Sequence, residues 1–282
     1  MDKKLSNTLV NEEYYDSIYI NYNVDDTIQI LHNVDVFLKN AKQVHTSWVG
    51  LYHHDFDKTL KGKKVLELGC GDCLNAAVMS VLGAEVYGND LSQHCGTIIN
   101  NINSRFAFET PLKFIHGDFL QADIPYDFFD IVVGKAFVHH LTYEEEVQFT
   151  EKIVRILKKD GVVRYCEPAI NSIILDKIRF MIPLQGRPSS FQTEKFKEWK
   201  ALDPHPERDN SSSGYRKMGM KYFSSTEIYC IGCLEKFHRL LPSKINSKKF
   251  RRKAFVIERY LPLFIRNIFA RAQMVEYRFP KK

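Results

Sequence analysis

Hydrophobic positions in the middle of the chain alternate between two periods. Short aliphatic and β-branched runs, typical of buried strands, are separated by longer segments with helical spacing. The five runs are residues 64–68, 84–89, 112–115, 129–133 and 162–166. Strands and helices that alternate in this way predict right-handed crossovers between parallel strands. We therefore expect an α/β fold with a Rossmann-like, doubly wound sheet covered by helices on both faces.

Local signals mark the ends of the helices between these strands. Ser92 is suited to cap a helix that runs towards Arg105. Thr142 and Glu145 have the spacing of a capping box, and Gly161 supplies a stop signal before the fifth strand. These signals support the helical assignment of the segments between the strands.

Two flanking regions lack the alternation. Residues 1–60 contain many Tyr, His and Asn residues and a few helical patches, and we expect them to form a helical roof on the main domain at 61–282. Residues 168–223 are rich in proline and include the polar run 210–214. Long irregular insertions in compact domains are commonly functional. We therefore predict that residues 168–223 form a substrate lid.

Regular structure is expected to resume towards the end of the chain. Ser224 begins a Ser-Ser-Thr-Glu motif that resembles a helix cap, and residues 236–241 have the pattern of a strand. A helical stretch interrupted by Pro262 spans 249–271, and residues 273–279 form a closing strand. The prediction is a largely parallel, seven-stranded sheet whose last strand is antiparallel.

Composition excludes several classes of protein. The 282 residues are 44% hydrophobic and 26% charged, and no apolar run approaches the length of about 20 residues that spans a bilayer. The first residues lack the apolar core of a secretory signal, so we expect a cytoplasmic protein. The six cysteines are expected to be reduced thiols. Two Cys-x-x-Cys pairs, at 70/73 and 230/233, are far apart in the sequence, and we expect no metal site.

The net charge of +6 conceals a basic C-terminal segment on an acidic body. Residues 236–282 hold 14 Lys and Arg against two acids, whereas residues 1–235 hold 26 against 32. A basic segment of this kind suggests an anionic partner, such as a phosphorylated acceptor or the face of a membrane, or it is simply solvated. An apolar helical stripe runs from Phe255 to Phe269. We expect this stripe to pack on the sheet, with peripheral membrane contact as the alternative.

The first candidate site follows the first predicted strand. Residues 65–73 read Val-Leu-Glu-Leu-Gly-Cys-Gly-Asp-Cys, and glycines at the end of a strand let a ligand approach the main chain. The second strand ends about 20 residues later at Asp90, where a carboxylate can accept both hydroxyls of a ribose. The pattern predicts a site for a nucleotide-like ligand.

Five segments in the same order resemble the motifs of class I S-adenosylmethionine-dependent methyltransferases. The subgroup that is most similar includes quinone-biosynthesis enzymes and glycan- or lipid-tailoring enzymes, of the methyltransferase type 11 group. The resemblance covers about residues 60–168. The segments are Glu67–Gly71, Val86–Ser92, Phe114–Phe119, Phe129–Leu141 and Ile156–Gly161.

The resemblance implies S-adenosyl-L-methionine as the cofactor and a role for each matched residue. Glu67 would fix the glycine loop or meet the methionine amino group. Asp90 would take the ribose hydroxyls, and Asp118 would meet the adenine edge. The full set of expected cofactor residues is Glu67, Gly69, Gly71, Asp90, Leu91, Asp118, Phe119 and Lys135.

Candidate acid–base residues lie at the same edge of the predicted sheet. His139 and His140 follow the fourth strand, and a neutral imidazole can act as a base near pH 7; the alternative is that they brace the loop. Glu167 ends the fifth strand, where it would orient the acceptor or cap the loop. Tyr15 and Tyr19 are candidate aromatic residues of the roof, together with Trp48.

We therefore expect methyl transfer to a small-molecule, glycan or lipid-precursor acceptor, at oxygen and by in-line displacement. One alternative is a nicotinamide-dinucleotide-dependent oxidoreductase on the same fold. Another is a nucleic-acid-modifying methyltransferase that uses the basic segment. No Asn-Pro-Pro-Tyr-like element follows the fourth strand, so nucleic acid is not the expected partner. The acceptor and the oligomeric state cannot be read from the residues.

Overall fold

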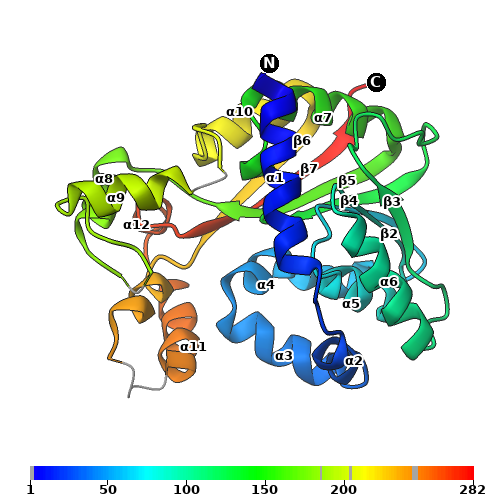
Figure 1. Ribbon diagram of the computed structural model, residues 1–282, viewed down its shortest axis with the longest axis horizontal. Coiled ribbons are helices and arrows are strands. Elements are labelled where there is room, and N and C mark those ends of the chain that lie inside the picture. Colours follow the sequence, from blue (N-terminus) through cyan, green and yellow to red (C-terminus); the bar gives the residue numbers. More distant parts are fainter. Residues whose placement is uncertain (1–2, 185, 203–204, 243–246) are drawn as a thin grey trace.

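The computed structural model describes residues 3–184, 186–202, 205–242 and 247–282 (Figure 1). Seven strands form a single sheet in the order β3-β2-β1-β4-β5-β7-β6. The strands are β1 Lys64–Leu68, β2 Glu85–Asp90, β3 Lys113–His116, β4 Phe129–Lys135, β5 Leu157–Pro168, β6 Phe223–Ile231 and β7 Ala272–Pro280. Strands β1 to β5 pair in parallel, and β7 is antiparallel to both β5 and β6. The predicted Rossmann-like sheet with an antiparallel last strand is confirmed.

Helices cover both faces of the sheet. Adjacent residues of a strand point to opposite faces, so Val65 packs in one apolar cluster and Leu66 in the other. The first cluster joins the sheet to α2 Asp25–Leu31, α3 Val34–Val44, α4 Thr46–Leu51, η1 His53–Thr59, α5 Leu74–Val81 and α6 Gln93–Arg105. The second joins it to η2 Val138–His140, α7 Tyr143–Ile156 and α10 Ser212–Tyr222. The sheet is therefore buried on both faces, as its uninterrupted apolar strands require.

Helix caps follow the sequence signals. The Ser92 hydroxyl accepts a hydrogen bond from the His94 amide at the start of α6. Thr142 and Glu145 form both bonds of a capping box at the start of α7. Helix α6 follows β2 and helix α7 follows β4, so the loops before both helices lie at the carboxyl edge of the sheet.

The N-terminal 60 residues have two different roles in the fold. Helix α1, Lys3–Tyr19, crosses in front of the sheet (Figure 1) and packs against α6, where the Ser92 hydroxyl bonds the Asp16 carboxylate. Helix α4 instead packs directly on the sheet, against β5, β6 and β7. The predicted roof aromatic Trp48 belongs to α4 and is a core residue, stacked on Tyr52 with ring centroids 5.3 Å apart.

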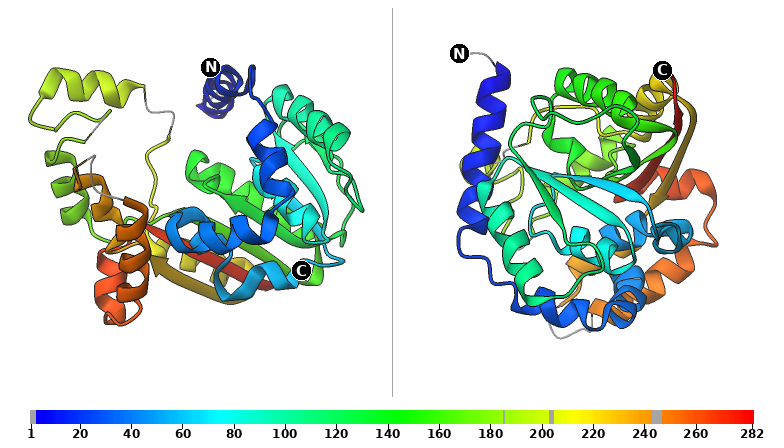
Figure 2. Two further views of the ribbon diagram at one scale, coloured as in Figure 1. Left: turned by 90° about the horizontal axis from the view of Figure 1, so that it is seen from below. Right: turned by 90° about the vertical axis from the view of Figure 1, so that its right-hand side faces the viewer.

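The insertion at 168–223 contains more regular structure than its composition predicts. Helices α8 Ile173–Met181 and α9 Thr193–Ala201 stand away from the sheet (Figure 1). The elements η3 Glu235–Leu240, α11 Ser247–Glu258 and α12 Leu263–Ile268 follow later in the chain, and α12 contacts β6 at the end of the sheet. We call this group of five elements the accessory lobe. Figure 2 shows the lobe projecting beyond the edge of the sheet. The last helix of the insertion, α10, packs on β6 and β7.

The prediction of a helix that begins at Ser224 is wrong, because Phe223–Ile231 is strand β6. The Ser-Ser-Thr-Glu motif is a local signal, and it competes here with pairing to β7, where Thr226 lies opposite Tyr277. A β-branched and aromatic segment next to an open strand edge gains more from the ladder than from a cap.

The prediction of a strand at 236–241 is also wrong. The segment is the 3-10 helix η3, and it curls around the fully buried Glu235. The Glu235 carboxylate accepts hydrogen bonds from the Thr46 hydroxyl at 2.9 Å and from Arg251 and Arg271 at 2.6 Å. The two guanidinium groups lie far along the chain, so no local pattern could indicate this bend.

The predicted apolar stripe of the C-terminal segment does not pack on the sheet as a whole. Phe255 is buried where α11 meets η3 and α3. In contrast, Ile257 is 54% exposed and Phe264 is 64% exposed. The expected crossover helix is replaced by two short helices that leave apolar side chains at the surface. Across the residues that the structure describes, no helix has the length and apolar character needed to cross a membrane.

Candidate active site

The glycine loop after β1 forms the floor of the site. Gly69 and Gly71 both have positive φ, +62° and +52°, which side chains with a Cβ rarely adopt. A Cβ on Gly71 would lie 2.6 Å from the Tyr19 hydroxyl, and one on Gly69 would overlap the Phe137 ring. Two reasons therefore require glycine at these positions. The turn needs a positive φ, and α1 and the loop after β4 leave no room for a Cβ.

Asp90 holds this loop to the end of β2. Its carboxylate accepts hydrogen bonds from the Gly71 amide at 2.9 Å and the Ser92 amide at 3.1 Å. Burial raises the pKa of Asp90 to about 7, although these two amides act in the opposite direction. The predicted acid of the second strand therefore lies directly beside the glycine loop.

Glu67 lies beneath the loop and does not line the cavity. It is 1% exposed, and one carboxylate oxygen accepts a hydrogen bond from the Asn75 side chain at 2.7 Å. The other oxygen is buried and has no hydrogen-bond partner within the part of the chain that the structure describes. Burial raises the pKa of Glu67 to about 7, with Lys135 close enough to oppose the shift. A buried oxygen without a partner is costly, so it favours a cationic or hydrogen-bonding ligand at this point.

A cavity of about 320 Å³ lies above the loop. The remaining seven predicted cofactor residues line it: Gly69, Gly71, Asp90, Leu91, Asp118, Phe119 and Lys135. Asp118 follows β3, where one carboxylate oxygen accepts the Leu120 amide at 2.9 Å. Residues from the ends of β1, β2, β3 and β4 thus meet in one space, as expected at the carboxyl edge of a doubly wound sheet.

His140 is the predicted acid–base residue that reaches this cavity. Its Nε2 lies 3.1 Å from the Tyr15 hydroxyl, and its Nδ1 lies 3.1 Å from the Asn11 carbonyl oxygen. A carbonyl oxygen only accepts, so Nδ1 carries the proton and Nε2 accepts from the phenol. Burial and the neighbouring imidazoles lower the pKa of His140 to about 2, while burial raises that of Tyr15 to about 12. The pair is therefore a neutral imidazole with a protonated phenol.

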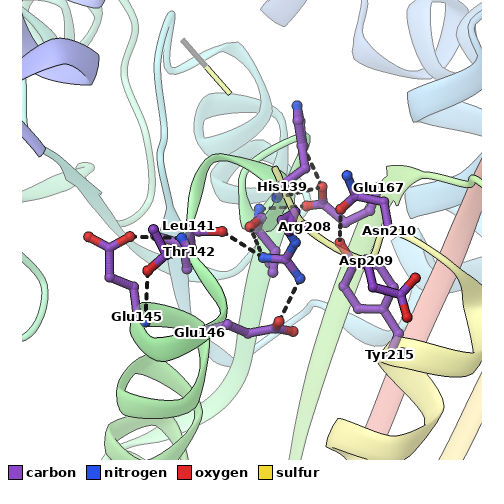
Figure 3. A network of polar contacts seen from close by, with 12 residues as sticks. His139, Leu141, Thr142, Glu145, Glu146, Glu167, Arg208, Asp209, Asn210 and Tyr215 are labelled. Carbon is purple, nitrogen blue, oxygen red and sulfur yellow. Dashed lines mark hydrogen bonds and ion pairs between the residues drawn. The ribbon is translucent and has the colours of Figure 1, made fainter. Parts of the chain in front are cut away.

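His139 and Glu167 lie behind the cavity, because neither lines it. The Glu167 carboxylate accepts the amides of Phe137 and Val138, each at 2.9 Å, and lies 2.7 Å from His139 Nδ1 (Figure 3). Both carboxylate oxygens thus face the loop after β4. This geometry fixes the conformation of the loop that carries His140.

The insertion reaches the site through residues 205–210. The Arg208 guanidinium donates to the carbonyls of Val138 at 2.6 Å and Leu141 at 2.9 Å, and it pairs with Glu146 (Figure 3). The same segment places the His205 ring 4.3 Å from that of His140. The far part of the predicted lid, α8 and α9, contributes no residue to the described lining of the cavity.

Three imidazoles consequently lie together beside the cavity. Ring nitrogens of His139, His140 and His205 lie within 4.8 Å of one another, a spacing that metal ligands also have. Both ring nitrogens of His140 make hydrogen bonds, to Tyr15 and Asn11, so neither is free to bind a metal ion. The three imidazoles therefore form a polar cluster next to the cavity.

Sequence reasoning missed several residues of the site. Asn11, Phe137 and Glu145 line the cavity, and His205 and Arg208 of the insertion contact His140 and Val138 without lining it. Helical spacing of Asn11, Tyr15 and Tyr19 on one side of α1 was the available signal for the roof. No local pattern indicates His205 or Arg208, because both meet the site only through contacts with residues far along the chain, His140 and Val138.

Comparisons with known proteins agree with the geometry. Residues 66–165 match the family model described as a methyltransferase domain. An uncharacterised methyltransferase of Mycobacterium tuberculosis is 34% identical over 77 residues, 27% of this chain and 37% of that protein. Phosphoethanolamine N-methyltransferase of Plasmodium falciparum is 28% identical over 112 residues, 38% of this chain and 40% of that one. The chain thus spans about two fifths of the length of the curated relatives that it matches.

The fold is shared with solved structures at low sequence identity. Phosphoethanolamine N-methyltransferase 2 of Haemonchus contortus, solved with phosphomonomethylethanolamine and S-adenosylhomocysteine, superposes with a TM-score of 0.53. The identity is 14%, and the match covers 93% of this chain and 61% of that one. This likeness concerns the fold alone.

Proposed function

We propose, on the premise that residues 66–165 are a methyltransferase domain, that the chain transfers a methyl group from S-adenosylmethionine to a small-molecule acceptor. One observation carries the proposal. A single cavity is lined by the glycine loop, Asp90 and Asp118 together with Tyr15 and His140. Residues suited to the cofactor and residues suited to an acceptor in one cavity are what group transfer requires.

The acids that line the cavity fit this cofactor. The Asp90 carboxylate suits the ribose hydroxyls and Asp118 suits the adenine amino group, whereas the unpartnered Glu67 oxygen lies beneath the glycine loop and outside the lining of the cavity. When bound, S-adenosylmethionine supplies a methyl group that is already activated by its sulfonium. The protein then has to orient the acceptor, exclude water and receive a proton.

His140 is our candidate for the group that receives the proton, although burial and the neighbouring imidazoles lower its pKa to about 2 and so weaken it as a base. Its Nε2 accepts from the Tyr15 hydroxyl at the wall of the cavity, so a proton that leaves the acceptor can reach it directly or through the phenol. Glu167, His139 and Arg208 act as positioning residues, because they hold the loop that carries His140 and do not line the cavity.

We infer a hydroxyl acceptor on a small molecule, glycan or lipid precursor, because a hydroxyl must lose its proton as the methyl group arrives. A phosphorylated amine is the second candidate, favoured by the similarity to phosphoethanolamine N-methyltransferase of Plasmodium falciparum.

A calorimetric titration with S-adenosylmethionine, S-adenosylhomocysteine and NAD tests the cofactor. We expect micromolar binding of both adenosyl compounds and none of NAD, with unchanged binding in the exposed control Asp35→Ala. Binding of NAD alone would return the chain to the oxidoreductase alternative. A methyl-transfer assay with phosphoethanolamine and with hydroxylated anionic metabolites then separates the two acceptor classes.

A further inference from the structure

A second cavity lies in the accessory lobe. It has a volume of about 220 Å³ and lies between α8, η3 and the end of α12. None of its lining residues also lines the cofactor cavity. The lobe that contains it projects beyond the sheet (Figure 2). The cavity therefore has no part in the methyltransferase site described above, and its chemistry is a separate question.

The lining carries a large excess of positive charge. Five cations, Arg179, Arg187, Lys236, Arg239 and Arg271, face one acid, Asp176. Arg179 pairs with Asp176 at 2.8 Å and Arg271 pairs with Glu235 at 2.6 Å. Among the described acidic residues, none lies within ion-pair distance of Lys236 or Arg239. Uncompensated cations on the walls of one cavity favour an anionic ligand.

Two of these cations have additional signs of an unfilled site. The Arg187 guanidinium donates to the carbonyls of Arg179 and Ile182, yet its buried Nε has no partner in the described structure. Burial lowers the pKa of Arg239, and repulsion from Arg271 acts in the same direction. An anion in the cavity would relieve both the missing hydrogen bond and the repulsion.

The rim of the cavity contains exposed apolar side chains, among them Ile178, Ile182 and Ile268 at 44%, 41% and 44%. Ile174 on α8 does not line the cavity but is 72% exposed, and with Ile178 and Ile182 it forms a stripe at four-residue spacing. No residue of α8 or α12 is buried. On α12, Leu263 and Phe264 are each about two thirds exposed. An amphipathic helix with no protein surface against its apolar stripe is typical of proteins that lie on a membrane.

We propose that the accessory lobe docks on an anionic phospholipid surface, with a phosphate headgroup in the cationic cavity and the isoleucines of α8 and the apolar side chains of α12 among the acyl chains. The charge of the lining selects the headgroup. The exposed rim decides between a membrane and a soluble phosphate, because a soluble phosphate gives no reason for apolar side chains around the cavity. The inference goes beyond the proposed function and does not depend on it.

Co-sedimentation with vesicles of phosphatidylcholine, with and without phosphatidylserine, tests the proposal on the full chain. We expect binding only to the anionic vesicles, weakened by salt. Each basic residue near a surface contributes about 1 kcal/mol, or about fivefold in binding, so Lys236→Gln with Arg239→Gln should weaken it by about 25-fold. Ile174→Ser with Ile178→Ser should also release the protein.

Matched variants control for charge and apolarity. Lys63→Gln with Lys159→Gln removes two exposed cations at the amino end of the sheet, and Met220→Ser removes an exposed apolar side chain of α10. Both should bind like the parent chain. Equal loss in the controls, equal binding to neutral vesicles, or binding of inorganic phosphate without any binding to vesicles would overturn the proposal. Titration with S-adenosylhomocysteine reports separately on the cofactor site and on folding.

Discussion

The two cavities of this chain differ in how their residues are held. The cofactor cavity lies at the carboxyl edge of the sheet, so Gly69, Asp90 and Asp118 take their positions from strand order and from the turns after β1, β2 and β3. The cavity of the accessory lobe is formed by short helices, and residues such as Lys236 and Phe269 meet only because those helices pack together. The first site follows from topology, whereas the second follows from side-chain contacts.

The electrostatics of the two cavities are opposite. Burial raises the pKa of Asp90 to about 7, and the acids of the cofactor cavity suit hydroxyls and an amine. In the accessory lobe, burial lowers the pKa of Lys236, and the unpaired cations suit a phosphate. The chain therefore keeps an acidic cavity and a basic cavity apart. Substitutions in one cavity should leave ligand binding in the other unaffected.

The largest effect is expected from His140→Ala, which removes the group that faces the acceptor. General-base catalysis contributes on the order of 100-fold or more, so kcat should fall by about that factor. Affinity for S-adenosylhomocysteine should be retained, because His140 is not among the residues expected to hold the cofactor. His32→Ala, an exposed histidine of the loop after α2, is the matched control. A fully active His140→Ala enzyme would remove this residue from the mechanism.

Asp90→Ala should have the next largest effect, on cofactor affinity. Two hydrogen bonds to a carboxylate at about 1.5 kcal/mol each correspond to a loss of about 100-fold in the Kd of S-adenosylhomocysteine. The Gly71 amide also loses its partner, which loosens the glycine loop. Calorimetry measures the change, and circular dichroism checks that the fold persists. Unchanged affinity would contradict the ribose assignment.

Glu167→Gln tests the positioning role of the carboxylate behind the cavity. The side chain accepts several hydrogen bonds from one loop, and an amide group replaces one acceptor oxygen with a donor. We expect a loss of about 2 kcal/mol in the free energy of unfolding, measured with urea. Glu227→Gln, on the exposed side of β6, should cost almost nothing. A Glu167→Gln protein of parental stability would refute the structural part of this role.

The pH dependence of cofactor binding should be smaller but diagnostic. Asp90, which lines the cavity, has a pKa raised to about 7, so it takes up a proton as the pH falls through 7 and loses the charge that attracts the ligand. Affinity for S-adenosylhomocysteine should therefore be about tenfold weaker at pH 6 than at pH 8. Asp90→Asn should flatten the profile. An affinity that is constant over this range would mean that Asp90 does not meet the ligand in its ionised form.

The smallest effect is predicted for Lys236→Gln with Arg239→Gln on the cofactor site. Neither residue lines the first cavity, so the Kd of S-adenosylhomocysteine should stay within about twofold of the parent value. Calorimetry with the same ligand provides the measurement. A larger change would show that the accessory lobe and the cofactor cavity are coupled.

The sequence alone determined the five parallel strands, the antiparallel closing strand and most of the predicted cofactor residues. Apolar runs buried on both faces can only be strands of a covered parallel sheet, and the turn residues after them fall at its carboxyl edge. Seven of the eight predicted cofactor residues meet there for that reason. Periodicity and turn chemistry are local properties, and they were enough for this half of the molecule.

Only the tertiary structure decided the candidate proton acceptor and the accessory lobe. The Tyr15–His140 contact joins residues 125 positions apart, and Arg208 reaches Val138 across 70. The misassigned segments, β6 and η3, take their conformations from pairing with β7 and from the buried Glu235. In each case a contact between distant segments outweighs the local propensity, and such contacts leave no periodic signal in the sequence.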